Sequence, residues 1–168
     1  MKRRLVSTAA AVTVVGLLGV AFAGAAGART DRMLAFDVMT PVVVPYVGST
    51  NPIRGINGGG LAWELHSARG QLTAGGSLKV EVEGLVLAAT HSNPIGLFKA
   101  IVSCQAIVAG AAQVVNVATG TFTATTGLAS AGGGNADIEA QLTLPEPCIA
   151  PIVFVASGGG SWFAATGF

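Results

Sequence analysis

Residues 78–83 read Leu-Lys-Val-Glu-Val-Glu, an uninterrupted alternation of apolar and charged side chains. In an extended strand, successive side chains point to opposite faces, so the three apolar residues would share one face and the three charges the other. Such a strand packs one face on a core and leaves the other in water. The stretch therefore predicts a β-strand within a layered sheet.

Similar patterns recur along the chain, separated by turn-forming clusters rich in glycine, proline, serine and asparagine. Alternation or short apolar runs predict further strands at 98–104, 121–125, 137–144 and 152–155. The last of these, Ile-Val-Phe-Val, is apolar on both faces, which predicts a central position in its sheet. No stretch after residue 28 sustains helical spacing over three turns.

We therefore expect one all-β domain over residues 53–168, an immunoglobulin-like or Greek-key two-sheet β-sandwich of seven to nine strands. Residues 29–52 contain Pro41 and Pro45. Because proline cannot donate a hydrogen bond to a neighbouring strand, this segment is expected to be extended or to form an edge strand.

The first 28 residues have the anatomy of a secretory signal peptide. A basic start, Lys2-Arg3-Arg4, precedes an apolar run over 5–23 and a small-residue cleavage site, Ala26-Gly27-Ala28. A retained membrane anchor is the alternative, although alanine and glycine make the run weakly hydrophobic. We expect a helical Sec-type signal peptide over 1–28, cleaved near Ala28, and a secreted mature chain that does not span a membrane. The arginine pair is a weak match to a twin-arginine signal.

The mature chain would comprise residues 29–168, which is 168 − 28 = 140 residues. Without the three basic residues of the signal peptide, six basic and eight acidic residues remain, giving a net charge of 6 − 8 = −2. That balance excludes the basic footprint of a nucleic-acid-binding protein. Only 14 residues in 140 are charged, well below the usual quarter, so the surface is neutral and apt to associate.

Two cysteines, Cys104 and Cys148, remain in the mature chain. In an exported protein an even pair indicates a disulfide, which would close a loop of about 45 residues and add roughly 3–4 kcal/mol of stability. Two buried free thiols are the alternative. A metal site is disfavoured, because neither cysteine has a second cysteine or a histidine at ligand spacing.

Two glycine triplets precede the chain's two tryptophans, Trp63 and Trp162. If exposed, these rings and Tyr46 would form a ligand platform of the kind that carbohydrate-binding modules present to sugars.

The competing interpretation places both tryptophans in the core, with the glycines as joints that turn the chain into strands. Trp63 alternates with Leu61 and Leu65, which favours a core-facing position. The choice between platform and core depends on the burial of two side chains.

The remaining candidates for chemistry are polar pairs on predicted strands. Glu64 and His66 are two residues apart, a spacing compatible with metal ligation, but no third ligand is identifiable. Glu81 and Glu83 would lie roughly 6.5–7 Å apart, as carboxylates of inverting glycosidases do, yet nothing nearby predicts a concave setting. We assign no catalytic residue, metal or cofactor, and a hydrolase built on these four residues is the least favoured function.

Four stretches carry a resemblance to known sequences: RGINGGGLAW (54–63), NPIGLFKAIVSC (93–104), the region from ATGTFTATTG (118–127) to PCIAPIVFV (147–155), and WFAATGF (162–168). They resemble a group of small uncharacterised secreted proteins of high-GC Gram-positive, actinobacterial bacteria. The resemblance implies a stand-alone secreted domain in which Cys104 and Cys148 are the recurring pair. It implies no activity and no catalytic residue.

The sequence thus predicts a secreted, non-enzymatic structural or interaction protein, at the cell surface or outside the cell. Self-association through strand edges, or contact with a cell-surface or glycan partner, would be its mode of action. A carbohydrate-binding module with exposed aromatics is the alternative.

Overall fold

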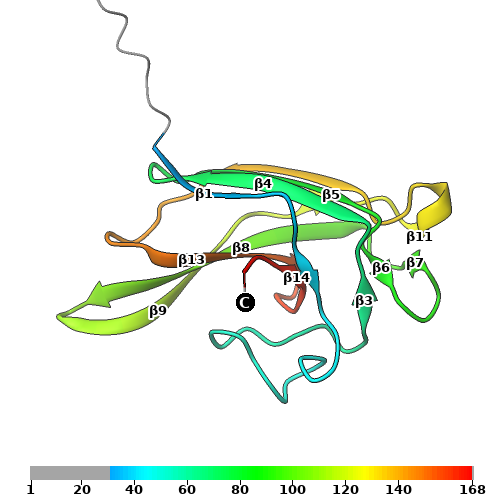
Figure 1. Cartoon of the computed structure of the whole chain (residues 1–168), viewed down its shortest axis with the longest axis horizontal. Coiled ribbons are helices and arrows are strands. Elements are labelled where there is room, and N and C mark those ends of the chain that lie inside the picture. Colours follow the sequence, from blue (N-terminus) through cyan, green and yellow to red (C-terminus); the bar gives the residue numbers. More distant parts are fainter. Residues whose placement is uncertain (1–30, 168) are drawn as a thin grey trace, which may run out of the picture.

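The computed structural model describes residues 31–167, so the predicted signal peptide lies outside the described residues. This part of the chain is built from antiparallel sheets, which confirms the expected all-β sandwich (Figure 1). One layer is a four-stranded sheet in the order β1-β4-β5-β12. Its strands are β1 (Arg32–Phe36), β4 (Ser67–Thr73), β5 (Ser77–Glu83) and β12 (Ala136–Gln141).

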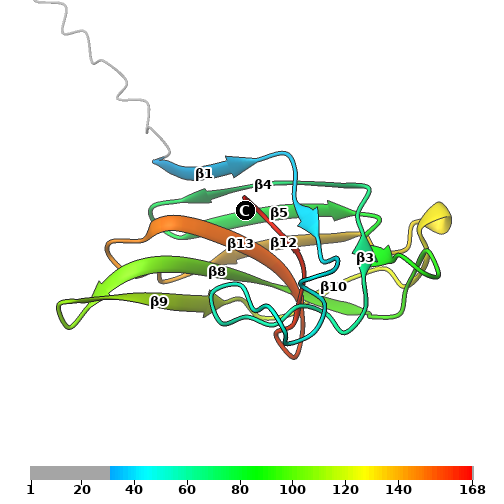
Figure 2. The ribbon, with the colours of Figure 1, turned by 60° about the horizontal axis from the view of Figure 1, so that its bottom comes forward.

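The other layer is a six-stranded sheet in the order β10-β8-β13-β14-β2, in which β9 also pairs with β8. Its strands are β2 (Thr40–Pro41), β8 (Leu97–Val108), β9 (Ala111–Ala118), β10 (Phe122–Thr123), β13 (Ile149–Ser157) and β14 (Trp162–Ala165). Figure 1 shows this sheet lying beneath the β1-β4-β5-β12 sheet, and Figure 2, with the lower side turned forward, shows the β8–β9 hairpin at one end of the molecule.

A third, small sheet closes one end of the sandwich in the order β11-β7-β6-β3. Its two-residue strands are β3 (Trp63–Glu64), β6 (Val86–Leu87), β7 (Ser92–Asn93) and β11 (Gly127–Leu128). A 3₁₀ turn at Ala129–Ala131 follows β11. Within the described residues 31–167, eight of the fourteen strands have four or more residues, which is within the seven to nine expected. Within residues 31–167, no helix has the length and apolar character needed to cross a membrane.

The core lies between the two large sheets and follows the alternation read from the sequence. Leu78, Val80 and Val82 are buried on β5, which lies between β4 and β12 as an internal strand. Residues 152–156 of β13 are all buried, and the strand is central between β8 and β14, as predicted. Each apolar face is thus removed from water by the opposite layer.

Two predicted strands are shorter than expected. Of residues 121–125, only Phe122–Thr123 pair as β10, because the chain then turns away and Thr125 bonds the 132–135 loop. Of residues 137–144, the strand ends at Gln141, where Leu142 bonds the backbone of Gly76 instead of continuing the ladder.

The N-terminal segment contributes to both large sheets. Strand β1 forms the outer edge of one sheet and β2 forms the outer edge of the other, which agrees with the expectation drawn from Pro41 and Pro45. Met39, which lies between β1 and β2, and Val42, which follows β2, are both buried in the common core. The segment is therefore packed as part of the sandwich.

The disulfide predicted from the cysteine count is present between Cys104 and Cys148, with a Cα–Cα distance of 4.9 Å. It joins the middle of β8 to the residue that precedes β13. The bond therefore fixes the base of the β8–β9 hairpin to the neighbouring strand.

The first glycine triplet lies against the tryptophan that follows the second triplet. Gly58 forms a parallel bridge with Trp162, and the amide of Gly59 donates to the Trp162 carbonyl over 2.8 Å. A Cβ added to Gly58 would lie 2.0 Å from the carbonyl oxygen of Tyr46, so only glycine fits. The triplets are joints in the β-fold, as the core interpretation required.

Candidate interaction surface

The aromatic residues singled out in the sequence lie in the core. Trp63 is 3% exposed and Trp162 is fully buried. Trp63 stacks on Phe163 with ring centroids 4.0 Å apart, and Tyr46 packs half-buried against Trp162. The candidate platform is therefore not formed, because burying large apolar rings is more favourable than leaving them in water.

One residue assigned to the core with Trp63 is exposed. Leu61 retains 60% of its accessible surface, although Leu65 is partly buried. Strand β3 begins only at Trp63, so the alternation of faces does not extend back to residue 61.

Glu81 and Glu83 share the outer face of β5 as predicted, but the four polar candidates do not gather in one pocket. Glu64 contacts His91, with Oε1 and Nδ1 2.5 Å apart, and its expected neighbour His66 lines a shallow groove with Glu83. Glu81 belongs to a different row of charges. Within residues 31–167, no group of three or more His, Cys, Asp or Glu side chains is arranged to hold a metal ion. The pocket that a hydrolase would need from these four residues is not formed.

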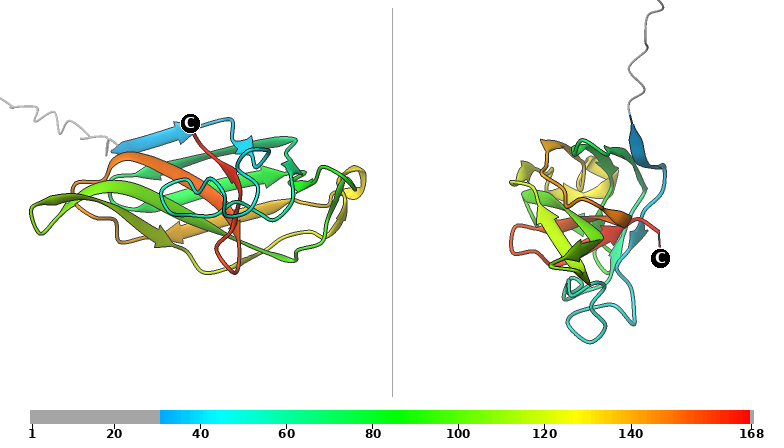
Figure 3. Two further views of the ribbon diagram at one scale, coloured as in Figure 1. Left: turned by 90° about the horizontal axis from the view of Figure 1, so that it is seen from below. Right: turned by 90° about the vertical axis from the view of Figure 1, so that its left-hand side faces the viewer.

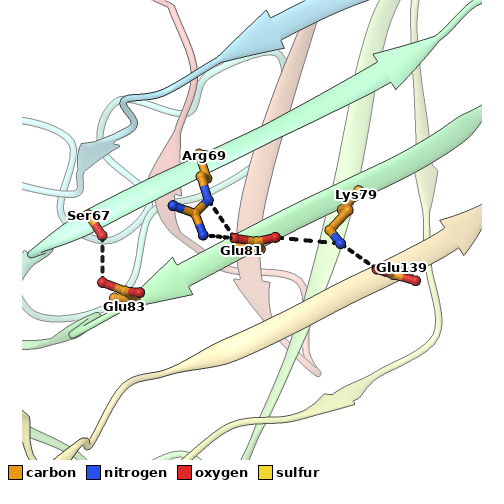
Figure 4. A network of polar contacts seen from close by, with 6 residues as sticks. All are labelled: Ser67, Arg69, Lys79, Glu81, Glu83 and Glu139. Carbon is orange, nitrogen blue, oxygen red and sulfur yellow. Dashed lines mark hydrogen bonds and ion pairs between the residues drawn. The ribbon is translucent and has the colours of Figure 1, made fainter. Parts of the chain in front are cut away.

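The outer face of the β1-β4-β5-β12 sheet carries a ladder of opposite charges (Figure 4). Arg69 of β4 pairs with Glu81 of β5, and Lys79 of β5 lies 3.5 Å from Glu81 and 2.8 Å from Glu139 of β12. The register explains these contacts, because Arg69 is directly opposite Glu81 and Lys79 directly opposite Glu139. The ladder therefore ties three adjacent strands together.

The ladder also opposes the acid role considered for Glu81. The hydrogen bond from Arg69 holds the pKa of Glu81 below its usual value, and contacts with Glu139 and then Glu81 raise the pKa of Lys79. A general acid of a glycosidase needs a carboxyl whose pKa is raised, in an apolar setting. The carboxylate of Glu81 is instead kept ionised, as expected for a polar sheet surface.

One long stretch of the chain carries no charge. Residues 100–136 contain no Asp, Glu, Lys, Arg or His, a run of 37 residues between Lys99 and Asp137. This run includes most of β8 and all of β9. Beyond Lys99, the β8–β9 hairpin is therefore a region of β-structure without charge.

Strand β9 is the exposed edge of that region. It reads Ala-Ala-Gln-Val-Val-Asn-Val-Ala over residues 111–118, and none of its residues is fully buried. Within residues 31–167 it pairs with β8 alone, over eight residue pairs, so its outer edge has no neighbouring strand. Figures 1 and 3 show the hairpin extending beyond the other strands at one end of the sandwich.

The other edges of the two large sheets carry features that oppose pairing with another chain. Strand β1 has Arg32 and an irregular register between Arg32 and Leu34, and β2 is two residues long and contains Pro41. Strand β12 presents Asp137 and Glu139, and β10 is two residues long. Strand β9 has neither charge nor proline, is eight residues long and pairs with β8 in unbroken register.

Exposed apolar side chains flank this edge. Ile149, Gln105 and Val114 are opposite one another across β13, β8 and β9, and both Ile149 and Val114 are about half exposed. Ile107 lies two pairs further toward the turn, on the same face, and is 52% exposed. Together with the bare backbone edge they form the surface that we call the β9 edge: Gln105, Ile107, residues 111–118 and Ile149.

The β9 edge is held by contacts at its base. The Asn116 amide donates to the carbonyl of Arg54, whose guanidinium donates in turn to the carbonyls of Ser103 (2.9 Å) and Ala150 (2.7 Å). With the disulfide, these bonds join β8, β9, β13 and the loop around residue 54. A braced edge loses little conformational entropy on binding.

No protein-family model, curated protein or solved structure matches this chain. The assignment of a function therefore depends on the geometry alone.

Sequence analysis predicted no strand over 111–118. Two signals were present: the uncharged run 100–136, and Gly110 between two stretches rich in valine, isoleucine and alanine. Alanine and asparagine in that stretch weaken the strand pattern, so composition alone did not reveal it.

Proposed function

We propose that the mature chain is a secreted, non-enzymatic interaction protein that acts at the cell surface or outside the cell, with the β9 edge as its contact surface. The observation that carries the proposal is the contrast among sheet edges. Four are short, charged or contain proline, whereas β9 is long, regular and uncharged. Unprotected edges of this kind pair readily with other chains.

The disulfide supports an extracellular setting, since such bonds persist in oxidising compartments. The low charge of the whole chain is compatible with an assembly or surface-associated role, because few charges are available to keep copies apart. The dispersed positions of Glu64, His66, Glu81 and Glu83 give no support to a hydrolase.

The proposal is tested by placing a charge on the edge. Val114→Lys introduces a cation beside the outer edge of β9, and we expect at least a ten-fold loss of binding, whether to copies of the chain or to producing cells. Leu128→Lys is the matched control, because Leu128 is a similarly exposed apolar residue on β11, away from the hairpin. Sedimentation velocity measures self-association, and a cell pull-down measures surface binding.

Circular dichroism establishes that both variants keep the β-fold. A mature chain that stays monomeric at millimolar concentration and binds neither cells nor itself would refute the proposed function. Equal binding losses in the two lysine variants would refute the assignment of the β9 edge.

A further inference from the structure

We propose that the β9 edge is occupied by a second copy of this chain, paired antiparallel through β9 about a two-fold axis at Val115. The proposal rests on the proposed function, which identifies the β9 edge as a contact surface. It goes further by naming the partner and the register of pairing.

The hairpin turn determines which backbone groups of β9 are free to pair. Ala109 and Gly110 both have positive φ, 50° and 80°, and form a two-residue turn closed by the Val108–Ala111 pair. Such a closing pair is hydrogen-bonded, and hydrogen-bonded pairs then alternate along an antiparallel ladder. The bond from the Thr119 amide to the Ala100 carbonyl continues the same alternation.

It follows that alternate residues of β9 direct their amide and carbonyl groups to β8. The remaining residues direct theirs to the open side. These outward residues are Ala112, Val114, Asn116 and Ala118.

The four outward residues are arranged symmetrically about Val115. A two-fold axis perpendicular to the sheet requires one residue of an antiparallel edge to lie opposite its own copy. Centring the axis on Val115 pairs Ala112 with Ala118 of the second copy, and Val114 with Asn116. All outward amides and carbonyls of both copies then gain partners.

Other positions of the two-fold axis leave some of the outward amides and carbonyls of β9 without a partner. An axis at Val114 would pair Ala118 with Gly110, which is already in the turn, and an axis at Asn116 would pair Ala112 with Gly120, beyond the strand. The hydrogen-bonding pattern of the strand therefore selects one register for a dimer.

The side chains on this register are mutually compatible. Val115 meets its own copy, Gln113 meets Val117, and alanine meets alanine at the ends. Because residues 100–136 carry no charge, two copies meet without like-charge repulsion. A partner recognised by its charge would find no counter-charge on β9 itself, and the nearby Arg54 guanidinium is already bound to the carbonyls of Ser103 and Ala150, which favours the second copy as occupant.

The turn end of the hairpin projects from the body of the molecule (Figure 3). Seven paired residues span about 20–24 Å at the usual rise of an antiparallel strand. An edge contact of this length is small, so we expect a reversible dimer whose population rises with protein concentration.

Cysteine cross-linking tests the register directly. In the proposed dimer, Ala112 of one copy lies opposite Ala118 of the other, within the Cα separation of about 5.5 Å that a disulfide accepts. The two Ala112 residues lie six residues apart along the ladder, about 20 Å, so neither variant links to itself. Both alanines are exposed and lie on the face opposite to Val115 and its cross-strand neighbour Cys104.

The experiment mixes purified Ala112→Cys and Ala118→Cys chains under mild oxidation, with each variant alone as control. We expect covalent dimers at least ten-fold above either control, on non-reducing gels and by peptide mapping that also confirms the Cys104–Cys148 bond. Equal linking in the controls, or no linking in the mixture, overturns the proposed dimer.

Hydrogen exchange on the unmodified mature chain gives an independent test. Amides of Ala112, Val114, Asn116 and Ala118 should become protected as protein concentration rises, while those of the β8-bonded residues stay constant. Absence of this alternation overturns the register. If cell binding still depends on Val114 while neither test detects a dimer, the proposed function survives and the second copy is excluded.

Discussion

The outer face of the β1-β4-β5-β12 sheet and the β9 edge are both exposed β-structure, yet their sequences differ sharply. The first carries the Arg69–Glu81–Lys79–Glu139 ladder and is bordered by edges with charges or an irregular register. The second has no charge at all over residues 100–136. The difference teaches that the first sheet carries charge both on its outer face and on its edge strands, whereas the edge strand β9 carries none.

The two regions are also stabilised by different forces. Exposed ion pairs contribute little net stability, because solvent screens them and holding long side chains in place costs entropy. The hairpin depends instead on a covalent bond at Cys104 and on the buried apolar face of β8. Substitutions should therefore have unequal effects on the two regions.

The largest expected effect is that of removing the disulfide. Cys104→Ala combined with Cys148→Ala should lower the free energy of unfolding by about 3–4 kcal/mol, because the unfolded chain regains the entropy of a loop closed across 44 residues. Urea unfolding at low protein concentration, where copies remain apart, measures the change. A loss below about 1 kcal/mol would show that the bond does not brace the sandwich, since native disulfides typically contribute 2–4 kcal/mol.

The fold was largely predictable because its strongest signals are local. The alternation over 78–83 and the doubly apolar run 152–155 are strand patterns that any packed sandwich must satisfy, and both strands lie where expected. The pairing of β5 with β12, whose facing residues are more than fifty positions apart in sequence, is a long-range contact that periodicity does not specify.

The candidate surface was less predictable than the fold. Sequence reasoning looked for aromatic and titratable side chains, whereas the β9 edge is defined by backbone groups and by an absence of charge. Trp63 and Trp162 attracted attention as large aromatic rings, but large rings are also the residues that a core gains most from burying. An unprotected edge becomes visible only when strand order is known.

A smaller effect is expected at the turn that ends the hairpin. Ala109 has a φ of 50°, a left-handed conformation that asparagine and glycine adopt more readily than alanine. Ala109→Asn would create an Asn-Gly turn and should stabilise the chain by about 0.5–1 kcal/mol. Thermal or urea unfolding of the monomer measures the gain.

Ala112→Asn serves as the control for that substitution. Residue 112 is also exposed on the hairpin, but it lies in β9 and its φ is not positive, so asparagine brings no relief there. Equal stabilisation by the two substitutions would contradict the role assigned to the turn.

The smallest effects are expected on the charged face, and they should depend on pH and salt. The lowered pKa of Glu81 means that its contribution to stability is present above its unfolded-state pKa and is lost as pH falls through the lowered folded value. The raised pKa of Lys79 gives a contribution that is present below its unfolded-state pKa and is lost as pH rises through the raised value. Arg69→Gln should remove most of the acid-side loss, and Glu139→Gln most of the alkaline-side loss.

A salt titration distinguishes the charged face from the β9 edge, because the two should respond differently. Sodium chloride at 1 M screens exposed pairs over about 3 Å, so it should flatten the pH dependence caused by the ladder. Residues 100–136 carry no charge, so association through the β9 edge should persist or strengthen as the salt concentration rises. Sedimentation and unfolding measured across the same salt series distinguish these outcomes. Dissociation of copies in high salt would show that charges outside the hairpin hold them together, and the contrast between the two regions would fail.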